Sequence, residues 1–289
     1  KALLTSGLAR LGVPPPPPSA DAAAQPISAP AAAAVQPPTP KPAKRPDERA
    51  ATAYKPIIVL DPGHGGHDSG AMRNGAVEKE VVLAFSLVLR SRLEATGRYK
   101  VLMTRNTDRF IPLHERREFA ENNNASLFIA IHADYVPSST ARGATIYSLR
   151  EGVANSLARS STGARSDAVL SSDDLAKLKG VGDPGMVSNI LADLTARATL
   201  ATRDRTGTFV RSVIEFMGQS TSMKDNPDRS AAFAVLRTAK VPAVLIELAY
   251  VSNHQDAINL KSDTWRNKVA SSIVTAVENY FSHQVARLP

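Results

Sequence analysis

Two histidines and a glutamate stand at the ends of apolar runs, where their side chains could hold a metal ion. His64 follows the first run within Asp-Pro-Gly-His-Gly-Gly, and His132 ends a second run in Ile-Ala-Ile-His. Glu247 ends a third run in Val-Leu-Ile-Glu. Two imidazoles and one carboxylate form a ligand set of catalytic zinc, which keeps one coordination position for water. These residue types therefore point to metal-assisted hydrolysis.

A single histidine after a strand is more often an ordinary surface or core residue than a ligand. The combination is harder to dismiss, because a carboxylate at the end of an apolar run is costly to bury unless it is paired or metal-bound. Glu78, in Val-Glu-Lys-Glu, begins a helical pattern and could close onto the same point, although Glu80 fits equally well on spacing alone. The remaining histidines have no comparable placement: His67, His114, His254 and His283.

Apolar runs that alternate with helical patterns must position these side chains. The runs predict strands at 57–60, 99–104, 127–131, 143–149 and 243–248. Apolar spacing and capping signals predict helices at 81–93, 113–122, 230–238 and 264–281, and another that begins at Asp183-Pro184. This alternation is typical of an α/β fold with a mostly parallel sheet covered on both faces. The carboxyl ends of parallel strands face one crevice, so we expect His64, His132 and Glu247 to converge there.

Composition divides the chain near Tyr54. Residues 1–53 hold twelve of the 20 prolines and no aromatic residue, which predicts a disordered Pro/Ala-rich linker. Residues 54–289 form the predicted globular domain. Within it, residues 151–206 read as an insertion, partly irregular and partly helical, and insertions of that length are usually functional or disordered.

The net charge of +8 and a pI of about 9.8 suit an anionic partner. No nucleic-acid motif or aromatic stacking run accompanies the charge, so a nucleic-acid binder is disfavoured. The absence of cysteine excludes a disulfide scaffold, a thiol nucleophile and a Cys-ligated zinc finger. No stretch approaches the roughly 18 to 20 apolar residues of a membrane span. The first residue, Lys1, indicates a fragment or a mature form.

Several motifs together resemble the zinc-dependent N-acetylmuramoyl-L-alanine amidases of the Amidase_3 family. The matching segments are 58–70, 78–79, 104–105 with Asp108, 127–134 and 241–253, and the likeness spans about residues 56–283. The segment 237–253, Arg-Thr-Ala-Lys-Val-Pro-Ala-Val-Leu-Ile-Glu-Leu-Ala-Tyr-Val-Ser-Asn, is especially characteristic. The motifs occur in the family's order and spacing, which makes the resemblance specific.

The resemblance implies a mixed, six-stranded sheet and a Zn²⁺ ion bound by His64, Glu78 and His132. It implies that Glu247 is the catalytic carboxylate. Members cleave the amide between the lactyl group of N-acetylmuramic acid and L-alanine of the peptidoglycan stem peptide. Other residues in the matching motifs are expected to be scaffold: Arg105, Arg116 and Asp134.

The likeness favours the Gram-negative cell-division branch of the family, the AmiB/AmiC type. That branch implies a periplasmic enzyme with a helical insertion before the last strand, which covers the zinc until a LytM-type activator displaces it. A Glu-Asn pair in the insertion commonly blocks the metal. The corresponding register here falls on Gly163-Ala164, with Asp167 downstream, so the expected blocking carboxylate is missing or replaced.

Two other functions fit the same residues. A zinc peptidase could cut within the stem peptide, and a wall-binding module could keep the metal site without turnover. The presence of His64, Glu78, His132 and Glu247 together argues against a decayed site.

Overall fold

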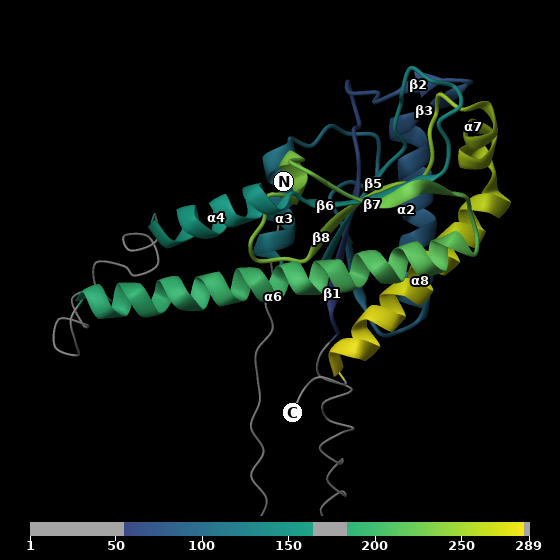
Figure 1. The fold of residues 1–289 in the computed structure, drawn as a ribbon. Coiled ribbons are helices and arrows are strands. Elements are labelled where there is room, and N and C mark those ends of the chain that lie inside the picture. The colour runs from purple at the N-terminus through teal and green to yellow at the C-terminus, as the bar shows by residue number, and fades with distance from the viewer. Residues whose placement is uncertain (1–54, 164–183, 286–289) are drawn as a thin grey trace, which may run out of the picture. The chain divides into compact units, whose positions relative to one another are not determined.

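The computed structural model describes residues 55–163 and 184–285, and a six-stranded sheet forms its centre (Figure 1). The strand order is β4-β1-β5-β8-β6-β7. The strands are β1 Ile57–Pro62, β4 Lys100–Met103, β5 Leu127–His132, β6 Ala144–Leu149, β7 Met223–Ala231 and β8 Ala243–Glu247. β4, β1, β5 and β8 are mutually parallel, whereas β6 pairs antiparallel with β8 and parallel with β7. The mostly parallel sheet that the apolar runs predict is therefore confirmed, as is the mixed, six-stranded sheet that the family resemblance implies.

Alternate residues of the central strands enter two separate cores, as the two-residue period of a strand requires. In β1, Ile58 and Leu60 pack toward the face covered by α2, α6 and α8, while Val59 packs toward α3 on the opposite face. All three are fully buried. Burial on both faces explains why these strands read as continuous apolar runs rather than as alternating ones.

The helices lie where most of the helical patterns predicted them. Their bounds are α2 Glu78–Ala95, α3 Leu113–Asn122, α4 Glu151–Gly163, α6 Pro184–Gly218, α7 His254–Lys261 and α8 Asp263–Val285. A short hairpin, β2 Met72–Arg73 and β3 Ala76–Val77, precedes α2. No helix in the described ranges is long and apolar enough to cross a membrane.

The helix predicted at 230–238 is wrong. Its residues belong to the end of β7 and to a single 3-10 turn, η1 Ala234–Leu236. β7 is a polar edge strand that contains Pro227, and its pairing with β6 shifts register between Ala144 and Ile146. An edge strand tolerates a proline and polar side chains on both faces. The sequence of β7 therefore shows neither an apolar run nor an alternation of apolar and polar residues from which a strand could be predicted.

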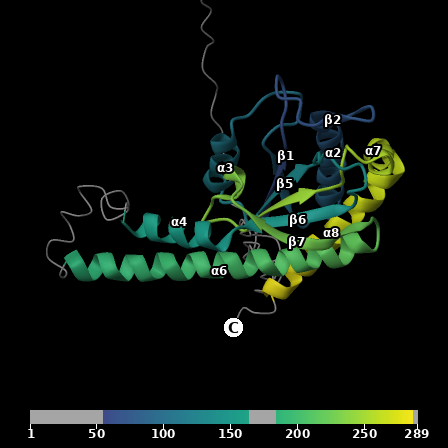
Figure 2. The ribbon, with the colours of Figure 1, turned by 45° about the horizontal axis from the view of Figure 1, so that its top comes forward.

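The predicted insertion contains α4 and the N-terminal half of α6. The two helices lie side by side and extend beyond the sheet (Figures 1 and 2). α6 continues without interruption to Gly218, and its C-terminal half joins the core through Phe209, Val213 and Met217. The predicted boundary at residue 206 therefore falls inside a helix. Asp167 and Ala164 lie outside the described residues, as does the predicted linker at 1–53.

Candidate metal centre

Adjacent parallel strands bring the predicted residues together at the carboxyl ends of the strands. β1, β5 and β8 are neighbours, so their carboxyl ends lie together. His132 and Glu247 are the last residues of β5 and β8 and are partners in the strand register. His64 follows the end of β1 by two residues. The convergence predicted from strand ends is therefore what the fold produces.

Three side chains form a compact group at these strand ends. Glu78 Oε1 lies 3.1 Å from His64 Nε2 and 3.0 Å from His132 Nδ1. One ligand atom from each of the three residues falls within 4.8 Å of the others. Glu78 is the first residue of α2 and is buried, whereas Glu80 is exposed. Of the two carboxylates that spacing left open, Glu78 is the one that lies with the histidines.

Glycines make room for the group. A Cβ atom at Gly63 would lie 2.3 Å from the His132 ring. At Gly70, where φ is +63°, a Cβ would lie 2.6 Å from Glu78 Oε2 and 2.7 Å from the His64 ring. His64 itself adopts a φ of 58°, which is uncommon for a residue with a side chain. Glycine is therefore required at positions 63 and 70, because the backbone there passes too close to the three side chains for a Cβ atom to fit.

Two buried arginines hold the loop that carries His64. Arg116 donates to Asp61 Oδ1 at 2.8 Å and to the His64 carbonyl at 2.7 Å. Arg105 donates to the Gly63 carbonyl at 2.7 Å. Both guanidinium groups are almost completely buried, so their charge is balanced by these carbonyls and by Asp61. The contacts are those of the scaffold role expected for both arginines.

Asp68 is a residue of the site that the sequence reasoning missed. Its Oδ2 lies 2.9 Å from His64 Nδ1, on the side of the ring away from Glu78. A carboxylate on the second ring nitrogen fixes the orientation of a metal-binding histidine and raises its basicity. The four-residue spacing from His64 to Asp68 was the available signal, but the spacing within a Gly-rich loop does not reveal where either side chain points.

The electrostatics of the group favour a bound cation. Burial alone would raise the pKa of Glu78, but hydrogen bonds from His132 and His64 outweigh it and hold the pKa far below its usual range. Burial alone would lower the pKa of His64, but Glu78 and Asp68 raise it above its ordinary value. Two nitrogens and one carboxylate oxygen fit zinc.

Glu247 lies beside this group without joining it. It is 6% exposed, and its Oε2 atom has no hydrogen-bond partner in the part of the chain that the structure describes. Burial raises the pKa of Glu247 well above its usual range, and the carboxylates of Asp134 and Glu78 raise it further. A buried carboxylate with one unpartnered oxygen is costly, so its presence next to a metal-type cluster suggests a proton-transfer role.

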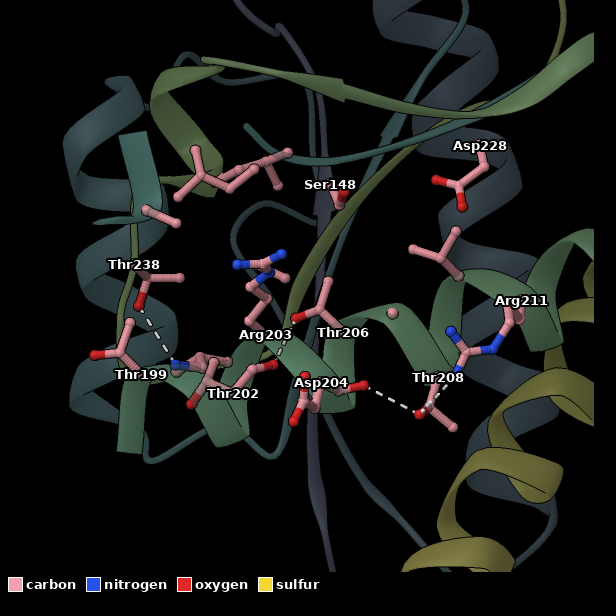
Figure 3. A pocket seen from close by; sticks show the side chains of 17 residues that line it. Ser148, Thr199, Thr202, Arg203, Asp204, Thr206, Thr208, Arg211, Asp228 and Thr238 are labelled. Carbon is pink, nitrogen blue, oxygen red and sulfur yellow. Dashed lines mark hydrogen bonds between the residues drawn. The ribbon is translucent and has the colours of Figure 1, made fainter. Parts of the chain in front are cut away.

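A separate cavity of about 460 Å³ lies near the amino-terminal end of β8, between α6 and the end of β6 (Figure 3). Ala243, the first residue of β8, and Leu149, the last of β6, both line it. Thr202 and Thr206 face it from α6 together with Arg203. His64, Glu78, His132 and Glu247 do not line this cavity.

Comparison with known proteins gives the chain a family. Residues 58–279 match the family model Amidase_3, described as N-acetylmuramoyl-L-alanine amidase. The chain is 36% identical over 227 residues to the N-acetylmuramoyl-L-alanine amidase AmiC of Escherichia coli O6:H1, covering 78% of this chain and 53% of that protein. It is 36% identical over 245 residues to AmiC of Neisseria meningitidis serogroup B, covering 83% of this chain and 56% of that protein. The chain thus spans about half the length of these two curated relatives.

A solved structure supports the same assignment. The N-acetylmuramoyl-L-alanine amidase AmiC2 of Nostoc punctiforme superposes with a TM-score of 0.55 at 25% identity, covering 79% of this chain and 98% of that one. Residues 58–279, which match the family model, contain the histidine cluster and Glu247. The fold that the resemblance implied is therefore confirmed, and the chain belongs to the Amidase_3 family.

Proposed function

We propose that the protein is a zinc-dependent N-acetylmuramoyl-L-alanine amidase that acts on peptidoglycan. His64, Glu78 and His132 hold the metal, and Glu247 is the catalytic carboxylate. The observation that carries the proposal is the group of three ligand atoms within 4.8 Å beside a buried carboxylate that keeps one oxygen unpaired. Zinc in such a site supplies polarisation of the scissile carbonyl and makes water nucleophilic near neutral pH.

Glu247 moves the proton. It accepts a proton from the attacking water, whose oxygen bonds to the lactyl carbonyl carbon. The carbon–nitrogen bond then breaks, and Glu247 returns the proton to the leaving amine of L-alanine. The products are a lactyl carboxylate and an intact stem peptide with a free amino group. Burial next to other carboxylates gives Glu247 the raised proton affinity that a general base needs.

Regulation by the insertion is part of the proposal. We propose a periplasmic enzyme of daughter-cell separation in which the insertion obstructs the cleft until a LytM-type activator displaces it. The paired helices α4 and α6, which extend beyond the sheet, support this reading. The described start of α4 follows Leu149, the last residue of β6, and β6 runs antiparallel to β8, so this start lies at the end of the sheet opposite Glu247.

The contact between Glu151 and Arg203 allows a clean deletion. Their side chains meet at 2.7 Å, which brings the start of α4 beside the middle of α6. A short Gly-Ser linker can therefore replace residues 152–199 and leave the core half of α6 intact. The full chain and this deletion are incubated with purified peptidoglycan, with zinc or with chelator, and the products are identified by mass spectrometry.

Intact stem peptides that begin with L-alanine, released only with zinc, support the amidase. Release by the deletion variant alone supports obstruction of the cleft by the insertion. Release by both proteins contradicts the obstruction but still supports the amidase activity. Fragments cut within the stem peptide would indicate a zinc peptidase instead. A folded, zinc-loaded deletion that binds peptidoglycan and releases nothing would indicate a silent wall-binding module.

A further inference from the structure

A second cavity, of about 490 Å³, opens on the same edge of the sheet as the histidine cluster. Its lining includes Arg73, Asn74, Tyr135, Arg142, Asn253 and His254. The β2–β3 hairpin supplies one wall and the start of α7 another, and Figure 1 shows these elements next to each other. No residue of the proposed zinc site lines this cavity, so it is a neighbouring site rather than the same one.

Chain connections place the cavity next to the cluster. The β2–β3 hairpin leads directly into Glu78, and the backbone N–H of Ala71, just before the hairpin, donates to Glu78 Oε2 at 2.8 Å. Tyr135 comes three residues after His132. A ligand that reaches the metal from this side would therefore pass over the hairpin and Tyr135, which is 47% exposed.

The walls of the cavity are fastened to each other. The Asn74 side chain donates to the carbonyls of Val251 and Ser252 at 3.0 and 3.1 Å. The Asn253 side chain donates to the Ser139 carbonyl at 2.8 Å. These bonds join the hairpin and the loop after β5 to the loop after β8. The cavity is thus a formed feature and not a gap between independent loops.

The charge of the cavity is positive. Arg73 and Arg142 line it, and no aspartate or glutamate of the described ranges does. Among the residues that the structure describes, the Arg73 guanidinium has no hydrogen-bond or ion-pair partner, and Arg142 donates to Ser222 Oγ at 3.2 Å. The nearby Asp256 is buried and turned inward, where it accepts from the backbone of Gly143 and Tyr250. The cavity therefore offers unneutralised guanidinium donors.

We propose that this cavity binds a free carboxylate of the stem peptide through Arg73 and Arg142. The inference rests on the proposed amidase function, since it assigns the substrate group that lies beyond the scissile amide. A guanidinium matches a carboxylate with two parallel hydrogen bonds, which gives geometric selectivity as well as attraction. Tyr135 supplies the apolar surface against which the peptide backbone packs.

The test compares two soluble N-acetylmuramoyl peptides that differ only in their stem carboxylates, free in one and converted to carboxamides in the other. We measure kcat/KM for the full chain and for Arg73→Gln, Arg142→Gln and the double variant. Arg98→Gln is the matched control, because Arg98 is 60% exposed and precedes β4 at the opposite edge of the sheet. The control removes the same charge without touching the cavity.

We expect the unsubstituted chain to prefer the carboxylate substrate about tenfold, the discrimination of one charged hydrogen-bonded pair at a partly exposed site. Each single variant should lose part of this preference and the double variant all of it, because the loss in kcat/KM falls on the carboxylate substrate. Arg98→Gln should keep the full preference. Equal kcat/KM values for the two substrates in the unsubstituted chain would overturn the proposal while leaving the amidase intact.

A binding measurement keeps the two proposals separable. Calorimetric titration with the free stem peptides, in carboxylate and carboxamide forms, needs no turnover. If neither substrate is cleaved, the amidase proposal fails, and the subsite stands only if Arg73→Gln and Arg142→Gln weaken the carboxylate peptide alone. Inorganic phosphate is titrated as a third probe. Binding of phosphate as tight as that of the carboxylate peptide, lost in the same variants, would indicate a general anion site and overturn the stem-peptide assignment.

Discussion

His132 and Glu247 are register partners at the ends of adjacent parallel strands, although a long stretch of chain separates them. This pairing sets a proposed metal ligand beside a proposed proton carrier through backbone hydrogen bonds of the central sheet. The roles of the two residues can therefore be separated by substitution, because neither side chain is needed to hold the other strand in place.

Glu247→Gln should bind zinc normally and lose most turnover. The amide keeps the size of the side chain but cannot accept the water proton, and general acid–base catalysis is worth about 10²- to 10⁴-fold in rate. Metal content is measured by plasma mass spectrometry and stem-peptide release by mass spectrometry. Turnover near that of the unsubstituted chain would remove Glu247 from the mechanism.

His132→Ala should lose zinc itself. Removing one of the three proposed protein ligands leaves too few to retain the ion against a competing chelator. Circular dichroism controls for folding, and His114→Ala is the matched control, since His114 is an exposed histidine in the first turn of α3. One equivalent of zinc retained in His132→Ala would show that the ligand is misassigned.

Asp68→Asn should weaken zinc binding by about 10- to 100-fold, the usual cost of losing the partner of a metal-binding histidine. The substitution leaves all three proposed ligands in place. Glu80→Gln provides the comparison, because it removes an exposed carboxylate two residues after Glu78. Zinc affinity is measured by competition with a chromophoric chelator, and equal affinities in the two variants would contradict a role for Asp68.

Gly63→Ala and Gly152→Ala should change stability in opposite directions. A Cβ at Gly63 meets the His132 ring at 2.3 Å, so the backbone or the ring must shift, at a cost of about 1–3 kcal/mol. Gly152 lies exposed in α4 with open space around it, and alanine there should stabilise by about 0.5–1 kcal/mol. Chemical denaturation measures both changes, and a neutral Gly63→Ala would refute the close packing.

Phe209→Ala should destabilise the fold by about 3–5 kcal/mol, as expected for a fully buried aromatic side chain. Leu200→Ala, nine positions earlier on the same helix, should stay within about 0.5 kcal/mol because Leu200 is 55% exposed. Denaturant unfolding distinguishes the two. Similar losses in the free energy of unfolding at both positions would show that the N-terminal half of α6 contributes as much to the core as its C-terminal half.

The sequence predicts the central strands well because burial on both faces leaves continuous apolar runs with polar residues at their ends. That is why His64, His132 and Glu247 could be assigned to one edge. The polar edge strand β7 could not be predicted, since its environment demands neither an apolar side chain nor a fixed period. Asp68 and the cavity at Arg73 depend on where loops fold back, and spacing along the chain carries little information about that.

The α6 helix has a mechanical consequence. Its 35 residues make a rod about 52 Å long, of which the C-terminal half is clamped in the core and packs against α8 through Phe209 and Ser212. The N-terminal half extends beyond the sheet, with α4 packed beside it. The described helix runs unbroken between the two halves. A displacement of its N-terminal end would therefore move the C-terminal half of α6, which covers the sheet together with α8, because no loop lies between the two halves to bend instead.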